Sequence, residues 1–238
     1  MKIGILQADS VLEKFQPEFG DYPGMFEDML EKAALSALVE EVDVAHYDVE
    51  HGVYPATTDE CDGYIITGSK KSVYDDEPWI HNLRAYVVEL HEARAKLVGI
   101  CFGHQMVAMA LGGKTEPAEI GWGVGVHQST LIGNKHYMQP PLPALSAIVS
   151  HKDQVTILPD NAQLLSTSEF CPNTMFQIEN HILTFQGHPE FAKGYSRALL
   201  NLRKDILGEA VYGKGIASLG QEIHSDIFAQ WILRFIAT

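Results

Sequence analysis

The feature that most constrains the fold is a cysteine between two glycines, at the junction of a predicted strand and a predicted helix. Residues 96–100 form a short apolar run that predicts a buried strand, and residues 105–111 predict a buried helix that ends at two glycines. Cys101 lies between these elements, with Gly99 two positions before it and Gly103 two positions after it. A sharp strand-to-helix turn brings backbones close together, so these two positions favour residues without a β-carbon. The pattern predicts a fold that presents Cys101 as a nucleophile.

Such a nucleophile needs a stabilised thiolate, because a free cysteine thiol is mostly protonated at pH 7. The start of a helix supplies part of this stabilisation, since its free N–H groups and its dipole favour an anion. The alternative is that Cys101 is a small core residue, because free cysteine is among the most buried residue types. The two glycines favour the nucleophile. Cys61 and Cys171 lack such glycines, and we interpret them as structural.

A base for this nucleophile is predicted in residues 186–190, which read Gln-Gly-His-Pro-Glu. The segment follows the apolar run 182–185, so His188 is expected near the end of a strand. Residues two apart on an extended chain point to the same side, so Glu190 can accept a hydrogen bond from the second ring nitrogen of His188. This carboxylate would fix the tautomer and stabilise the imidazolium. A His-Pro-Glu tripeptide alone is also typical of a surface turn, and its combination with Cys101 favours the catalytic interpretation.

The order of the predicted elements indicates an α/β fold with a mostly parallel sheet covered by helices. Apolar runs predict strands in the first half of the chain, at residues 3–8, 42–49, 63–67 and 97–100. Two helices are expected there, one opening at Pro23 and one over about residues 78–95. Apolar residues at helical spacing give the first of these helices a buried face: Met25, Phe26, Met29, Leu30, Ala33, Ala34, Ala37 and Leu38.

After Gly112 the pattern changes to strands joined by turns, which predicts a smaller antiparallel region. Its strands are expected at residues 126–132, 148–155 and 164–167 and in a hairpin over 175–185. Two helices, at about residues 193–207 and 221–236, are expected to close the chain. We therefore predict a single domain over residues 1–238, with a core at about 1–192 and C-terminal helices at 193–238.

Three residues of interest follow predicted strands directly. They are Gly68, Cys101 and His188. Because the carboxyl ends of parallel strands lie at one edge of a sheet, these residues are expected to meet there.

Composition restricts the partners and the compartment. The 17 basic and 31 acidic residues give a net charge of −14, which disfavours binding to nucleic acid or to an anionic membrane. Apolar runs stay short of the ~18 to 20 residues that span a bilayer, and the N-terminus begins a strand without a signal-peptide layout. Three cysteines without paired spacing are typical of a reducing compartment. We expect a cytoplasmic protein.

No cofactor and no metal site is predicted. The 11 histidines show no metal-ligand spacing such as His-Glu-x-x-His, and the sequence contains no Cys-x-x-Cys pair. Residues 63–70 nearly match a phosphate-binding P-loop. In this segment, however, a serine separates the second glycine from the lysine, and the first five residues form a predicted strand.

Together these residues resemble the class I, or triad-type, glutamine amidotransferases, whose signature is a Gly-x-Cys-x-Gly-x-Gln elbow and a later Gly-His-Pro-Glu segment. Both occur here in that order. Residues 64–69 resemble the strand and loop that contribute an oxyanion-hole amide in this family, and residues 150–155 resemble its Ser-His-Gly-Asp glutamine-contact loop. The resemblance covers roughly residues 1–192. It implies a flavodoxin-like, three-layer α/β/α fold similar to a stand-alone GMP-synthetase amidotransferase or a γ-glutamyl peptidase.

The resemblance implies a role for each matching residue. Cys101 would be the nucleophile, His188 the general base and acid, and Glu190 the orienting carboxylate. The oxyanion hole would be formed by the loop at Gly68 and Ser69 and by the backbone amide of Phe102. The residues implied to bind the substrate are Gln105, Ser150, His151 and Lys152.

Two departures from the family pattern concern loop geometry. Ser69 and Lys70 stand where many members have Gly-Pro, and Lys152 stands where many have glycine. These positions contribute mainly backbone, so the departures affect the shape of the loops more than the chemistry.

The implied reaction is attack of the Cys101 thiolate on the side-chain amide of glutamine, followed by hydrolysis of a γ-glutamyl thioester. Three functions remain open. The first is a glutamine amidotransferase that hands ammonia to a synthetase partner, because no synthetase region follows residue 238. The second is a free-standing hydrolase of γ-glutamyl peptides, a branch that residues 19–22 and 75–79 suit. The third is a non-catalytic binding or regulatory module, which the intact triad disfavours.

Overall fold

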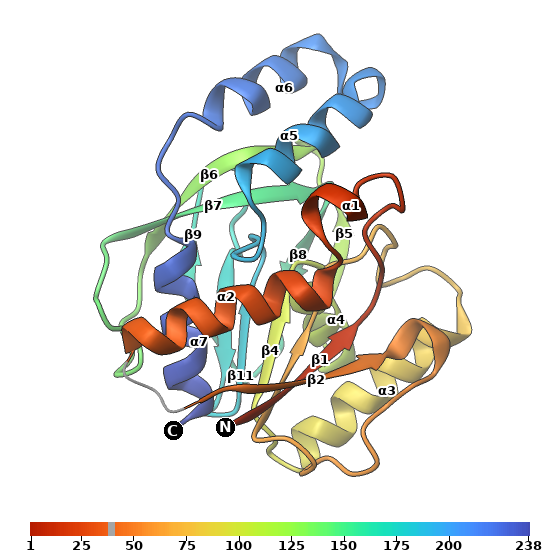
Figure 1. Cartoon of the computed structure of the whole chain (residues 1–238), viewed down its shortest axis with the longest axis vertical. Coiled ribbons are helices and arrows are strands. Elements are labelled where there is room, and N and C mark those ends of the chain that lie inside the picture. Colours follow the sequence, from red (N-terminus) through yellow and green to blue (C-terminus); the bar gives the residue numbers. More distant parts are fainter. Residues whose placement is uncertain (38–40) are drawn as a thin grey trace.

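A nine-stranded sheet, in the order β2-β1-β3-β4-β11-β10-β9-β6-β7, forms the centre of the computed structural model, which describes residues 1–37 and 41–238 (Figure 1). Its strands are β1 (Lys2–Gln7), β2 (Asp43–Asp48), β3 (Gly63–Ile66), β4 (Leu97–Ile100), β6 (Gly123–Leu131), β7 (Ala144–His151), β9 (Ala162–Thr167), β10 (Met175–Ile178) and β11 (Ile182–Phe185). The strands from β2 to β11 in this order are parallel neighbours, whereas β10, β9, β6 and β7 pair antiparallel. Two further strands, β5 (Lys114–Pro117) and β8 (Asp153–Ile157), form a separate small sheet.

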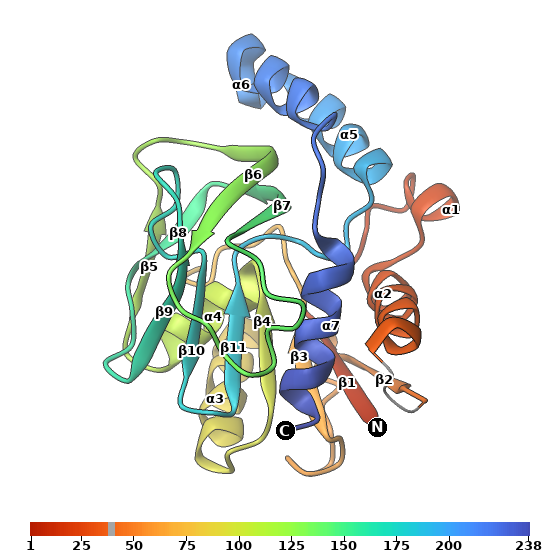
Figure 2. The same cartoon turned by 90° about the vertical axis from the view of Figure 1, so that its left-hand side faces the viewer.

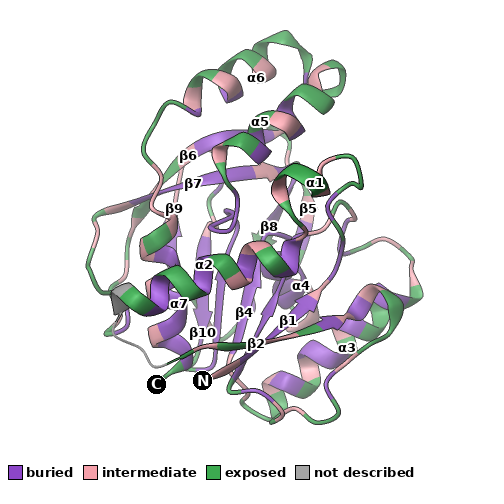
Figure 3. Cartoon of the chain, in the orientation of Figure 1, coloured by how far each residue is buried: buried purple, intermediate pink, exposed green. Residues whose placement is uncertain are grey.

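Helices cover both faces of the parallel strands (Figure 2). The helices are α1 (Gln16–Phe19), α2 (Tyr22–Ala37), α3 (Pro78–Glu92), α4 (Phe102–Ala110), α5 (Lys193–Leu202), α6 (Lys204–Ser218) and α7 (Ser225–Ile236), with a short 3-10 helix at Val49–His51. Helices α2 and α7 share one core with Ile3 and Ile65, while α3 and α4 share another with Leu6 and Ile66. Every residue of the central strands β3, β4 and β11 is buried (Figure 3). Because successive side chains point to opposite faces, these strands are buried on both faces and read as continuous apolar runs.

The predicted α/β fold with a mostly parallel sheet is confirmed. The helix expected to open at Pro23 is α2, and its predicted apolar residue Leu38 lies outside the described residues. The C-terminal helix α7 does not lie apart from the core, because Trp231 and Ile232 pack inside it. Helices α5 and α6 lie beside β6 and β7 at one end of the molecule (Figure 1).

Two predicted elements are wrong in their extent. The strand expected over residues 148–155 is two strands, because β7 pairs with β6 as far as His151 whereas β8 pairs with β5 in the small sheet. Lys152 is the turn between them. The helix expected over residues 193–207 is divided at Arg203 into α5 and the longer α6, which is kinked at Gly208 with a φ of 72°. Strand β5 and helix α1 were not predicted.

In the described part of the chain, no helix is both long enough and apolar enough to cross a membrane.

Candidate active site

Cys101 lies at the turn between β4 and α4, in a conformation that L-residues rarely adopt. Its φ is 52° and its ψ is −98°, and such backbone strain is typical of nucleophiles on a sharp strand-to-helix turn. The turn is held by hydrogen bonds, since the Cys101 N–H donates to the Phe185 carbonyl at 2.8 Å and the Gln105 N–H donates to the Cys101 carbonyl at 3.1 Å. Helix α4 begins at Phe102, three residues earlier than the apolar run indicated. Cys101 therefore lies directly at a helix N-terminus.

The two glycines around Cys101 are required by close backbone contacts. A β-carbon on Gly99 would lie 2.6 Å from the Gly103 carbonyl oxygen, and one on Gly103 would lie 2.5 Å from the Ile66 carbonyl oxygen. Real β-carbons essentially never come this close to another atom. Glycine at positions 99 and 103 therefore allows α4 to begin in close contact with β3 and β4.

Replacing Gly103 by alanine is expected to lower the free energy of unfolding by ~1–3 kcal/mol, because the added methyl group must displace backbone. The matched control is Gly213→Ala in α6, where an added β-carbon meets no atom within 4 Å. Urea denaturation of both variants measures the difference. Equal stabilities of the two variants would contradict the packing described here.

His188 lies beside Cys101 and is held by the carboxylate of Glu190. Its Nδ1 is 2.7 Å from Glu190 Oε1, and both side chains are buried, with exposed fractions of 4% and 0%. The His188 ring stacks on Phe191 with centroids 3.9 Å apart, and its backbone N–H donates to the Ile148 carbonyl at 2.8 Å. Because Nδ1 contacts Glu190, Nε2 is the ring nitrogen available to Cys101.

The surroundings of His188 raise its pKa above the ordinary value for histidine. Burial by itself lowers this pKa, but the charges of Cys101 and Glu190 and hydrogen bonds to both outweigh burial and raise it to about 10. By contrast, burial lowers the pKa of His104 and His151 to about 3, so both are neutral at pH 7. Among these buried histidines, His188 is the one whose surroundings favour a bound proton.

The loop at Gly68 lies directly against this pair. A β-carbon on Gly68 would lie 2.8 Å from His188 Cε1 and 3.8 Å from Cys101 Cβ. The N–H of Phe102 is the first of α4, so it has no acceptor within the helix. The N–H of Ser69 makes no hydrogen bond to any part of the chain that the structure describes. Two free backbone donors are therefore available near Cys101.

A pocket with an empty volume of about 380 Å³ opens beside Cys101. Six of the residues implied for catalysis or binding line it: Ser69, Cys101, Gln105, Ser150, His151 and Lys152. Four other implied residues are not part of its lining: Gly68, Phe102, His188 and Glu190. Gln105 is engaged within the protein, because its Nε2 donates to the Asp153 carbonyl at 2.8 Å and to Gln186 Oε1 at 3.1 Å.

Sequence analysis missed three side chains at this site. Asp153 is 5% exposed and lines the pocket, and one carboxylate oxygen accepts from the Ser72 hydroxyl. Its other oxygen, Oδ1, has no hydrogen-bond partner among residues 1–37 and 41–238. Gln186 Nε2 donates toward Cys101 Sγ at 3.6 Å. Arg203 lies against Trp122, 5.4 Å from the ring centroid, and donates to Ser150 Oγ at 2.7 Å.

The local sequence marks two of these three residues but not the third. Asp153 and Gln186 lie within the two segments that were singled out, so their position was available from the sequence. Arg203 comes from the junction of α5 and α6, far along the chain from the other pocket residues, and no local pattern marks it.

No group of three or more His, Cys, Asp or Glu side chains in the described ranges is arranged to hold a metal ion.

Comparisons with known proteins identify the family of the chain. Residues 23–202 match the family described as "Glutamine amidotransferase class-I". "Gamma-glutamyl peptidase 2" of Arabidopsis thaliana is 32% identical over 154 residues, which are 62% of this chain and 61% of that protein. A "GMP synthase [glutamine-hydrolyzing]" of Bacteroides fragilis is 27% identical over 71% of this chain but only 33% of that protein. The matches to the first two curated relatives span about three fifths of their length.

A solved structure shares the fold. The crystal structure of a glutamine amidotransferase from Thermotoga maritima superposes with a TM-score of 0.73 at 18% identity, covering 99% of this chain and 95% of that one. The family match includes β3, β4, α4, β11 and the elbow that carries Cys101. The chain belongs to the class I glutamine amidotransferase family.

Proposed function

We propose that this protein hydrolyses γ-glutamyl amide bonds, with glutamine as the simplest substrate, through a triad of Cys101, His188 and Glu190. The observation that carries the proposal is the buried contact of His188 with both Cys101 and Glu190 at the start of α4. A nucleophile, a base and an orienting carboxylate in this order form the general arrangement for acyl transfer.

The proposed reaction has two stages, which are formation of a thioester on Cys101 and hydrolysis of that thioester. The Cys101 thiolate attacks the amide carbon, and the oxyanion accepts hydrogen bonds from the N–H groups of Phe102 and Ser69. Protonated His188 gives its proton to the leaving nitrogen, which departs as ammonia or an amine and leaves a γ-glutamyl thioester. His188 then takes a proton from water as the water attacks the thioester. Glutamate is released, and the thiolate and the imidazolium are restored.

The pocket offers partners for the charged groups of the γ-glutamyl part. Asp153 lines the pocket, and its carboxylate suits an α-ammonium group. Lys152 makes no ion pair within the described ranges, and its ammonium suits the α-carboxylate.

A γ-glutamyl peptide is the second candidate substrate, and Arg203 favours it. The guanidinium has no carboxylate partner among the described residues, although it lines the pocket. The γ-glutamyl group carries only one carboxylate, which Lys152 can hold. Arg203 is therefore available for a carboxylate on the leaving peptide. The Arabidopsis relative named as a γ-glutamyl peptidase supports the same assignment.

Steady-state release of ammonia from glutamine, and of glycine from γ-glutamylglycine, tests the proposal. Arg203→Met is expected to raise KM for γ-glutamylglycine about 10-fold, the loss of one charge-assisted hydrogen bond, and to leave glutamine hydrolysis within about twofold. The matched control is Arg197→Met, an exposed arginine on α5 outside the pocket. Release from neither substrate by the unaltered protein would refute the proposed function. Equal effects of Arg203→Met on both substrates would remove the peptide assignment.

A synthetase partner is a further part of the proposal, suggested by the relative named as a GMP synthase, of which this chain matches only a third. In that case ammonia would pass to the partner instead of to solvent, and glutamate release from glutamine would rise by orders of magnitude when the partner is added.

A further inference from the structure

The loop that follows β3 carries the Ser69 N–H, which makes no hydrogen bond to any described residue. The direction of this N–H depends on how the backbone of residues 68–70 is held. Neither Ser69 nor Lys70 is a proline, so the restraint on this backbone has to come from hydrogen bonds.

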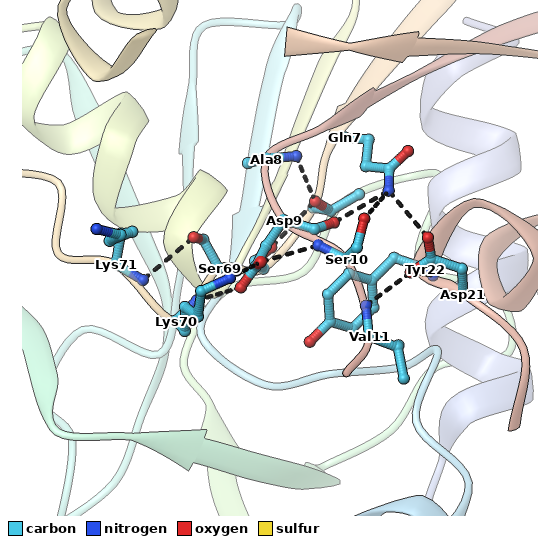
Figure 4. A network of polar contacts seen from close by, with 12 residues as sticks. Gln7, Ala8, Asp9, Ser10, Val11, Asp21, Tyr22, Ser69, Lys70 and Lys71 are labelled. Carbon is cyan, nitrogen blue, oxygen red and sulfur yellow. Dashed lines mark hydrogen bonds and ion pairs between the residues drawn. The ribbon is translucent and has the colours of Figure 1, made fainter. Parts of the chain in front are cut away.

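Asp9 restrains this loop (Figure 4). It lies in the segment after β1 and is 3% exposed. Its Oδ2 accepts a hydrogen bond from the Lys70 backbone N–H at 2.8 Å. Its Oδ1 accepts from the Ser10 N–H at 2.8 Å and also forms a close ion pair with Lys70 Nζ. One buried carboxylate thus binds both the backbone and the side chain of Lys70.

Thr67 holds the other side of the same loop. Its hydroxyl accepts from the Ala8 N–H at 3.0 Å and donates to the Gly68 carbonyl oxygen at 3.0 Å. A peptide unit is planar, and its C=O and N–H point in opposite directions when it is trans. Fixing the Gly68 carbonyl therefore also fixes the direction of the Ser69 N–H.

The segment that carries Asp9 is itself anchored. Gln7 Nε2 donates to the Asp9 carbonyl at 3.2 Å, to Ser10 Oγ at 2.9 Å and to Asp21 Oδ2 at 3.2 Å (Figure 4). The other oxygen of Asp21 accepts from the Val11 N–H at 2.7 Å. Asp21 directly precedes α2, so Asp9 is connected to a helix that packs on the sheet.

From these contacts we infer that Asp9 is a positioning residue, which holds Lys70 so that the Ser69 N–H points at the oxyanion formed on Cys101. This inference rests on the proposed function. Asp9 touches neither the substrate nor the reacting atoms, and it acts through the backbone of residues 68–70.

Asp9→Ala is expected to lower kcat about 10- to 100-fold with KM within about twofold, because a misdirected oxyanion donor weakens transition-state binding alone. The alkylation rate of Cys101 by iodoacetamide is expected to stay at the parent value, since that reaction forms no oxyanion. Asp9→Asn keeps the volume and one acceptor oxygen, and its loss of kcat is expected to be smaller than that of Asp9→Ala. The matched control is Asp48→Ala, which removes an exposed carboxylate at the end of the neighbouring β2.

Hydrogen exchange of the peptide spanning residues 67–71, measured by mass spectrometry, gives a second readout that needs no turnover. Asp9→Ala is expected to speed exchange there and Asp48→Ala is not. Unchanged exchange, unchanged kcat, or a loss of Cys101 alkylation equal to the loss of kcat in both Asp9 variants would overturn the inference. If the unaltered protein turns over no γ-glutamyl substrate, the proposed function fails, and the exchange rates still decide whether Asp9 holds the loop.

Discussion

Cys101→Ala is expected to abolish γ-glutamyl hydrolysis, with kcat lower by on the order of 10⁴-fold or more, because the reaction loses its covalent intermediate. Substrate binding should survive, since Cys101 is one of many residues that line the pocket and the others are unchanged in the variant. Ammonia or amine release measures kcat, and calorimetric titration with glutamine measures binding. A large loss of turnover with binding retained is the expected result.

The matched control for this variant is Cys171→Ala. Burial raises the pKa of the Cys171 thiol to about 12, so this cysteine stays protonated at neutral pH and cannot serve as the nucleophile. Its removal is expected to leave kcat within a few fold of the parent. If Cys171→Ala lost activity and Cys101→Ala kept it, the assignment of the nucleophile would be wrong.

Glu190→Gln is expected to lower kcat by about 10²- to 10⁴-fold, because the amide cannot stabilise the imidazolium and can hold His188 in the wrong tautomer. Among the causes that raise the pKa of His188 are the charge of Glu190 and its hydrogen bond. Removing the charge therefore lowers this pKa. The alkaline limb of kcat/KM, which in the parent reports loss of the His188 proton near pH 10, is expected at lower pH in the variant.

The pH profile of kcat/KM from pH 5 to pH 10.5 measures this shift. Glu119→Gln, a change at an exposed glutamate without a hydrogen bond to any described residue, should leave the profile unchanged. An alkaline limb that stayed in place in Glu190→Gln, with kcat near the parent value, would show that Glu190 does not act on His188.

The turn that carries Cys101 and the pairing of His188 with Glu190 could be predicted, because each depends on residues that are close together in the sequence. Gly99 and Gly103 flank Cys101 within one turn of chain, and His188 and Glu190 are two residues apart on an extended segment. Short-range geometry fixes such pairs before the rest of the fold is known. The parallel sheet could be predicted for a similar reason, since strands buried on both faces leave continuous apolar runs.

Contacts between distant segments could not be predicted. Asp9 and Lys70 are separated by 61 positions, and only the parallel pairing of β1 with β3 brings their loops together. Arg203 lies between α5 and α6, which follow all the strands in the sequence, and it donates a hydrogen bond to Ser150 in β7. The division of residues 148–155 at Lys152 depends on two partner strands in different sheets. Residues 150–154 are all polar, so the local sequence does not mark which of them ends the first strand.

The central claim is that a γ-glutamyl group is carried on Cys101, and rapid-quench mass spectrometry tests it most directly. The protein is mixed with glutamine, or with γ-glutamylglycine, quenched in acid during turnover and digested. The account predicts a γ-glutamyl adduct on the peptide that contains Cys101, formed before glutamate is released and absent in Cys101→Ala. Turnover without an adduct on that peptide, retained when Cys101 is replaced by alanine, would contradict it.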